Sequence, residues 1–228
     1  MTRIVNIGEA LIDEITRPNS EPVEVVGGSM LNVAAGLTRL GHESELATWF
    51  GRDARGNKVR AHAEAAGVTL TPGSDGADFT TVAHASLDER GRATYEFDLS
   101  WDVPAVEDPD SVGHVHTGSY AVVLEPGADK VLAAVKRQAI RGTVSYDPNI
   151  RPALLGTPDE ARPHIEAIVA LSDVVKASDE DLEWLYPGRP VEDVIREWSQ
   201  SGPSLILCTR GPWGVYIKAA AERDMLVV

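Results

Sequence analysis

The sequence contains a single cysteine, Cys208, among its 228 residues. A disulfide within the chain is therefore impossible, which favours a reducing compartment or indifference to one. No apolar stretch approaches the roughly 20 residues that a transmembrane helix needs. Residues 1–9 carry one basic residue and a short apolar run that stops at Glu9, which is too short for a signal peptide. We therefore expect a cytoplasmic protein with no membrane partner.

Basic residues are scarce, with 21 Lys and Arg against 35 Asp and Glu, for a formal charge of −14. Such a charge repels nucleic acid and anionic lipid, so neither is an expected partner. Hydrophobic residues make up 43% and charged residues 25% of the chain, which is typical of globular proteins. The length suits one α/β domain with a sizeable core.

Several common catalytic signatures are absent. Residues 51–58 have the glycine spacing of a phosphate-binding P-loop, but Asn57 takes the place of the required lysine. No Gly-x-Gly-x-x-Gly follows the first apolar run, and Ser119 lacks the Gly-x-Ser-x-Gly pattern of hydrolases. His114 and His116 share one face of a short strand, but no third ligand lies nearby, so a zinc site is not expected.

Strand-like and helix-like segments alternate along the chain. Short apolar runs predict strands at residues 3–8, 45–50, 143–146, 174–176 and 204–208. Helical patterns, several closed by glycine, cover residues 29–40, 57–66, 128–140, 159–171, 180–186 and 191–201. This order predicts an α/β fold with a parallel sheet, helices on both faces, and ligands at the carboxyl ends of the strands.

One region interrupts this alternation. Residues 79–87 alternate apolar and polar side chains, residues 88–92 resemble a turn, and residues 93–99 are strand-like again. Residues 11–26 contain further β-branched positions. We expect a small β-sheet drawn from about 11–26 and 79–99, standing off the main sheet as a lid. The alternative is an edge hairpin without a function.

Two motifs near the N-terminus are suited to binding hydroxyl groups. Gly28 belongs to a glycine pair before a helix, where a backbone can approach a ligand closely, and Asn32 offers both a donor and an acceptor. Asp13 follows the first strand, and its carboxylate can accept two hydroxyl hydrogen bonds from a polyol. The alternatives are a tight strand-to-helix turn and a solvated loop acid.

Two later motifs follow predicted strands. Asn149 and Arg151 come after the strand at 143–146, and arginine suits a phosphate or a developing negative charge. Residues 176–181 end the next strand with a lysine and acids that can hold Mg²⁺ through water, although Ser178 is also a good helix cap. Residues 209–214 supply a hydroxyl and glycine amides for a nucleotide phosphate.

Together and in this order, these motifs resemble the ribokinase-like (pfkB) carbohydrate kinases, and the Gly-Glu-x-Leu-Ile-Asp start resembles the fructokinase branch. The resemblance implies a Rossmann-like three-layer α/β/α sandwich with a β-sheet lid, formed by residues 1–228 as one domain. It also implies a kinase that transfers the γ-phosphate of ATP to a primary hydroxyl of a sugar, with Mg²⁺.

The resemblance also implies a role for each matching residue. The predicted sugar site consists of Asp13, Gly28, Asn32, Asp53, Asn149 and, from the lid, Tyr95 and Phe97. Arg151 is the predicted catalytic residue beside the transferred phosphate. The predicted nucleotide site consists of Lys176, Ser178, Thr209, Gly211 and Gly214.

The chain departs from the family pattern in two places. Ser178 and Asp181 stand where the family has Asn-x-x-Glu, so Asp181, or Glu180 in its place, is the predicted Mg²⁺ ligand through water. The family's Gly-Ala-Gly-Asp motif, which carries the catalytic base and the amides that stabilise phosphoryl charge, does not occur, and residues 225–228 form a strand-like end. Loss of a general base typically costs about 10²–10⁴-fold in rate. We therefore expect a truncated domain that holds sugar but is impaired in turnover.

Fructose is the expected sugar, with ribose, 2-keto-3-deoxygluconate, tagatose and nucleosides as alternatives. A monovalent cation is a further expected cofactor that the sequence leaves open. Exposed lid edges can pair with a second subunit, which would give a homodimer. The competing interpretation is a non-catalytic module that binds a sugar or a nucleotide.

Overall fold

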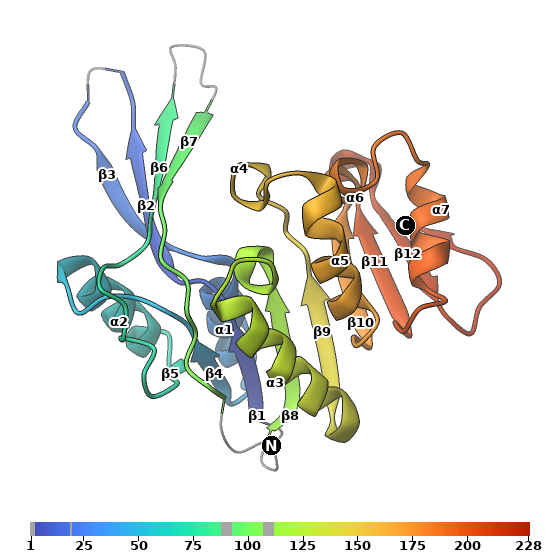
Figure 1. Cartoon of the computed structure of the whole chain (residues 1–228), viewed down its shortest axis with the longest axis horizontal. Helices are drawn as coiled ribbons and strands as arrows, with labels where there is room; N and C mark the ends of the chain where they lie inside the picture. The colour runs from blue at the N-terminus through green and yellow to red at the C-terminus, as the bar shows by residue number, and fades with distance from the viewer. Residues whose placement is uncertain (1–2, 19, 88–92, 107–111) are drawn as a thin grey trace.

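The computed structural model describes residues 3–18, 20–87, 93–106 and 112–228, which form two β-sheets with helices (Figure 1). The main sheet has the strand order β13-β12-β11-β10-β9-β8-β1-β4-β5. Its strands are β1 (Arg3–Ile7), β4 (Ser44–Ala47), β5 (Thr69–Leu70), β8 (Val112–Gly118), β9 (Thr143–Asp147), β10 (Val174–Ser178), β11 (Leu205–Thr209), β12 (Val215–Ala219) and β13 (Leu226–Val227). In this sheet order, all neighbouring strands between β11 and β5 pair in parallel, as the alternating pattern predicts.

Helices lie on both faces of the main sheet, and two apolar cores form on its two sides. In β4, Leu46 packs with α1 (Ser29–Arg39) and α2 (Ala54–Ala65), whereas Ala47 belongs to the opposite core. That opposite core holds the apolar faces of α3 (Gly127–Arg141), α5 (Pro158–Val169), α6 (Asp179–Leu185) and α7 (Val191–Trp198). The predicted three-layer α/β/α arrangement is therefore confirmed.

The small sheet has the order β3-β2-β6-β7 and stands away from the main sheet (Figure 1). Its strands are β2 (Leu11–Thr16), β3 (Val23–Gly27), β6 (Val82–Leu87) and β7 (Ala93–Asp98). In register, Val25, Asp13, Ala83 and Phe97 form one row across the sheet, and their sequence neighbours face the other side. The predicted turn at residues 88–92 lies outside the described residues.

The C-terminal edge of the main sheet differs from the fully parallel prediction. β12 pairs with β11 and β13 pairs with β12 in the antiparallel direction. The chain reverses through the short 3₁₀ turn η2 (Gly211–Trp213) and Gly214, which has a φ of 86°. A connection this short can only return the chain antiparallel. Among the described residues, no helix combines the length and apolar character needed to cross a lipid bilayer.

Candidate active site

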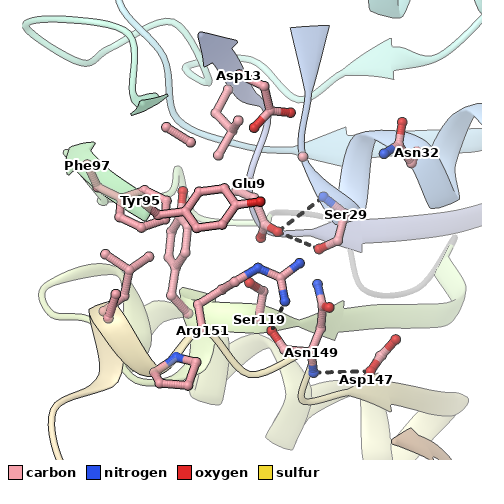
Figure 2. Close-up of a pocket in the computed structure, with 17 residues that line it drawn as sticks. Glu9, Asp13, Ser29, Asn32, Tyr95, Phe97, Ser119, Asp147, Asn149 and Arg151 are labelled. Atoms are coloured by element: carbon pink, nitrogen blue, oxygen red, sulfur yellow. Dashed lines mark hydrogen bonds between the residues drawn. The ribbon is translucent and has the colours of Figure 1, made fainter. Parts of the chain in front are cut away.

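A cavity of about 720 Å³ lies between the small sheet and the carboxyl ends of β1, β8 and β9 (Figure 2). Its lining consists of Glu9, Leu11, Asp13, Gly28, Ser29, Asn32, Ala83, Tyr95, Phe97, Ser119, Tyr120, Asp147, Asn149, Arg151, Pro152, Ala153 and Leu154. This is the edge at which parallel α/β sheets bind their ligands. Apart from Asp53, the predicted sugar-site residues and Arg151 line this one cavity.

Asp13 reaches the cavity from β2, and Figure 2 shows its carboxylate pointing into it. Burial raises the pKa of Asp13, and the positive charge of Arg151 across the cavity partly opposes that rise. A Cβ atom at Gly27 would lie 2.1 Å from Asp13 Oδ2, so the glycine leaves the space that this carboxylate occupies. The arrangement presents one carboxylate as a hydrogen-bond acceptor for hydroxyl groups.

Gly28 begins the turn into α1 with a φ of 113°, a conformation that favours glycine. The turn lies against the chain that leaves β1, and a Cβ atom at Gly28 would stand 2.4 Å from the carbonyl oxygen of Glu9. Glu9 Oε1 also accepts hydrogen bonds from the Ser29 amide at 3.1 Å and from the Ser29 hydroxyl. Asn32 lies on the first turn of α1 at the side of the cavity. These contacts fix the glycine turn beside the cavity.

The end of β9 supplies the opposite wall. Asn149 has a φ of 38°, and its backbone N–H donates to Asp147 Oδ1 at 3.1 Å. The other oxygen of Asp147 pairs with Lys176 Nζ of β10 at 3.0 Å. Burial raises the pKa of Asp147, and the positive charge of Lys176 opposes that rise only in part. Arg151 donates to the carbonyl oxygens of Asn149 and Ile150 at 3.3 and 3.1 Å, which orients its guanidinium towards the cavity (Figure 2).

The predicted nucleotide-site residues lie outside the cavity lining, at the ends of the next two strands. Ser178 of β10 and Thr209 of β11 are register partners, and the Thr209 hydroxyl donates to the Ala177 carbonyl at 3.4 Å. Gly211 and Gly214 follow in the turn after β11, with φ angles of 51° and 86°. The Asp147–Lys176 pair connects these strand ends to the cavity wall.

Asp181, a predicted Mg²⁺ ligand, already uses both carboxylate oxygens. Oδ1 accepts from the Ile150 amide and Oδ2 from the Ser178 amide, each at 2.8 Å. With the Ser178 hydroxyl accepting from the Asp181 amide, this forms a capping box at the start of α6. Asp181 is buried and holds the β9 loop to α6, whereas Glu180 beside it is exposed.

Asp53 lies behind the small sheet instead of in the cavity lining. Its Oδ1 accepts from the Gly56 amide at 2.7 Å and from the Thr80 hydroxyl at 2.8 Å, and its Oδ2 accepts from the Thr80 amide at 2.8 Å. The carboxylate thus caps α2 and holds the segment that enters β6. Its contacts are with the protein scaffold.

Several cavity residues were not among those predicted: Glu9, Ser29, Ser119, Tyr120 and Asp147. Ser119 and Asn149 are the non-glycine residues with positive φ in the described part of the chain, and both line the cavity. Such backbone conformations are costly and concentrate at functional sites. A signal for Glu9 and Asp147 was present, since both belong to the same strand-end segments as Asp13 and Asn149.

Comparison with known proteins places this geometry in a family. Residues 1–227 match the pfkB family of carbohydrate kinases. A fructokinase of Klebsiella pneumoniae is 30% identical over 220 residues, covering 92% of this chain and 71% of the relative. A fructokinase of Rhizobium leguminosarum bv. trifolii is 29% identical over 224 residues, covering 92% of this chain and 68% of the relative.

A solved structure of Vibrio cholerae O395 fructokinase, which contains fructose, ADP and a calcium ion, shares the fold. It superposes with a TM-score of 0.81 at 23% identity and covers 100% of this chain and 76% of that one. A double-mutant form of the same protein contains fructose, ADP and a potassium ion. The match along residues 1–227 and the 30% identity show that this chain belongs to the pfkB family of carbohydrate kinases.

Proposed function

We propose that the cavity binds a sugar, in the first place fructose, and that the site is built to pass the γ-phosphate of ATP to a primary hydroxyl of that sugar. The observation that carries this proposal is that Asp13 and Arg151 line the same cavity beneath the small sheet from opposite sides. The carboxylate suits sugar hydroxyls and the guanidinium suits a phosphate. The similarity to fructokinases favours fructose among the possible sugars.

The proposed reaction follows from what each strand end carries. In the family's reaction the aspartate of the Gly-Ala-Gly-Asp motif would accept the proton of the sugar hydroxyl, while the hydroxyl oxygen attacks the γ-phosphorus and the bond to the leaving ADP oxygen breaks. Arg151 and Lys176 would neutralise charge on the transferred group. ATP would lie along the ends of β10 and β11, against Ser178, Thr209, Gly211 and Gly214. The small sheet would act as the lid that excludes water.

Mg²⁺ fits this site only together with the nucleotide. Within the described ranges, no three His, Cys, Asp or Glu side chains form a group that could hold a metal. Asp181 is saturated by backbone amides, so the exposed Glu180 is the residue that would reach the ion through water. Mg²⁺ is typically bound by few carboxylates plus substrate phosphates. When bound here, it would neutralise charge on the ATP phosphates. A monovalent cation is proposed by analogy with the potassium-containing Vibrio cholerae structure.

The printed sequence contains no Gly-Ala-Gly-Asp segment and therefore no residue matching the family's catalytic base. We propose that the 228-residue chain binds fructose but is impaired in turnover. The same observation supports a second candidate, a non-catalytic module that binds sugar or nucleotide. ADP release that rises with fructose, even at a low rate, would favour the impaired kinase over the non-catalytic module.

The test combines thermal unfolding and ADP release on the purified 228-residue chain. Fructose should raise the melting temperature, because a ligand of the native state stabilises it, and tagatose, ribose and 2-keto-3-deoxygluconate should raise it less. Fructose-dependent ADP release should stay near background. Fructose-dependent ADP release at ordinary kinase rates would refute the impairment, and the absence of any shift with every sugar would refute the sugar site.

We also propose that a second copy of this chain covers part of the small sheet. Val23, Val25 and Tyr95 face the cavity side and are 49%, 48% and 55% exposed, and the two valines do not line the cavity. An apolar surface that the sugar leaves uncovered is typical of an interface. Val25→Asp should therefore convert a dimer to a monomer in light scattering, whereas Leu40→Asp, at the exposed C-cap of α1, should not. A monomeric wild-type chain at high concentration would refute the dimer.

A further inference from the structure

The rear face of the small sheet, turned away from the cavity, carries a row of charged side chains. Glu24, Glu14 and His84 are direct register partners on the adjacent strands β3, β2 and β6. Two carboxylates facing each other on neighbouring strands repel, so this pair needs a cation between them. Asp13, which points into the cavity, is the residue before Glu14 and faces the opposite side.

Arg55, in the first turn of α2, supplies that cation. Its Nη2 lies 2.8 Å from Glu14 Oε2 and its Nε lies 2.7 Å from Glu24 Oε1. Lys58, one turn further along α2, adds a contact of 2.6 Å to Glu24 Oε2. The side chains of Arg55, Glu14 and Glu24 are 34%, 21% and 24% exposed, so water screens these contacts only in part. The planar guanidinium donates to the two carboxylates through two different nitrogens held in a fixed fork, which an ammonium group lacks.

His84 extends the contacts to the remaining strand. Its Nδ1 lies 2.8 Å from Glu14 Oε1, and its Nε2 lies 3.1 Å from Asp98 Oδ2 of β7. Each of the four strands of the small sheet therefore contributes one side chain to a single network, and α2 holds that network through Arg55 and Lys58.

At the N-terminal end of the same helix, Asp53 accepts hydrogen bonds from the amide and hydroxyl of Thr80, in the segment that enters β6. From one end of α2, Arg55 thus holds the small sheet and Asp53 holds the segment that enters it. Because Asp13 and Glu14 are consecutive residues of one strand, a displacement of Glu14 must displace Asp13 as well.

We propose that Arg55 is a positioning residue for the sugar site: by joining Glu14 and Glu24 to α2, it sets the small sheet at the angle that places Asp13 over the cavity. The part of this inference that concerns sugar affinity rests on the proposed function. Arg55 does not line the cavity, so its effect on sugar must pass through the small sheet.

The test compares Arg55→Ala with Arg52→Ala as a matched control. Arg52 lies three residues earlier beside the same helix end, is 78% exposed and pairs with Asp75, away from the small sheet. Arg55→Ala should bind fructose about tenfold more weakly and should exchange the amides of β2 and β6 about tenfold faster, while those of β1 and β8 are unchanged. Arg55→Lys, which keeps the positive charge but loses the planar fork, should give fructose affinity and exchange rates between those of Arg55→Ala and the wild type. Arg52→Ala should match the wild type in both readouts.

Amide exchange is measured without sugar, so it decides the inference separately from the proposed function. If the wild-type chain binds no fructose, the proposed function fails, and the exchange of β2 and β6 still tests the role of Arg55. Equal exchange in Arg55→Ala and the wild type would overturn the inference. If Arg55→Ala does not fold, Glu24→Gln removes only one partner of Arg55 and should give the same selective loss of amide protection in β2 and β6. Unchanged protection in Glu24→Gln would then overturn the inference.

Discussion

Replacing Asp13 with alanine should weaken fructose binding about 100-fold or more. Hydrogen bonds to a charged group contribute about 1.5–3 kcal/mol each, and the carboxylate can accept two from neighbouring hydroxyls, so both are lost together. Asp13→Asn keeps one acceptor oxygen and should lose less. Isothermal titration measures both dissociation constants. Asp78→Ala removes an exposed acid outside the cavity lining and should bind like the wild type.

The affinity should also depend on pH through this residue. Burial raises the pKa of Asp13 from its usual value of 3.8, so the carboxylate is protonated at a higher pH than an exposed aspartate. Since the ionised form is the stronger acceptor, fructose affinity should fall as the pH is lowered through the raised pKa. Asp13→Asn should lack this dependence. If Asp13→Asn kept the pH dependence of the wild type, or if Asp13→Ala bound fructose as tightly as the wild type, the assigned role would be contradicted.

Replacing Gly28 with alanine should remove fructose binding and destabilise the fold. The added Cβ atom would stand 2.4 Å from the carbonyl oxygen of Glu9 and 2.8 Å from the Cα atom of Ala10, and both are backbone atoms that cannot rotate away. The positive φ adds strain of about 1–3 kcal/mol for a residue with a side chain. Together these effects should displace the turn that carries Ser29 and Asn32, and urea unfolding should show a loss of more than about 2 kcal/mol.

Gly41, just beyond the other end of α1, provides the control. It also has a positive φ, 87°, but a Cβ atom there would meet nothing within 4 Å. Gly41→Ala should therefore show the strain alone, with a modest loss of stability and normal fructose affinity. Equal losses of fructose affinity in Gly28→Ala and Gly41→Ala would mean that the close backbone approach at Gly28 has no part in binding.

The sequence carried most of the information about the fold because its signals are local and repeat. Glycines closing helices and short apolar runs place the central strands, and parallel order then brings the strand ends to one edge. This is why Asn149 and Arg151 could be predicted to line a site at that edge, whereas Asp13, expected there as well, reaches the cavity from β2 of the small sheet. β8 was harder to identify, because its histidines and glycines interrupt the apolar run that marks a core strand.

The side-chain partnerships could not be read from the sequence in the same way. Asp53 and Asp181 follow strands like the other acids, yet their carboxylates accept hydrogen bonds from backbone amides of the protein, those of Gly56 and Thr80 for Asp53 and those of Ile150 and Ser178 for Asp181. Asp147 lines the cavity and pairs with Lys176 of the neighbouring strand β10, a contact that no local sequence pattern indicates. The network around Arg55 depends on the register of the small sheet, which no local pattern specifies.

The most direct test of the sugar site is a titration of fructose into the purified 228-residue chain, run beside Asp13→Ala. The wild-type chain should bind fructose saturably, and the variant should bind it about 100-fold or more weakly. Equal binding by both would show that fructose occupies another place. The absence of binding by a folded wild-type chain would contradict the sugar site itself.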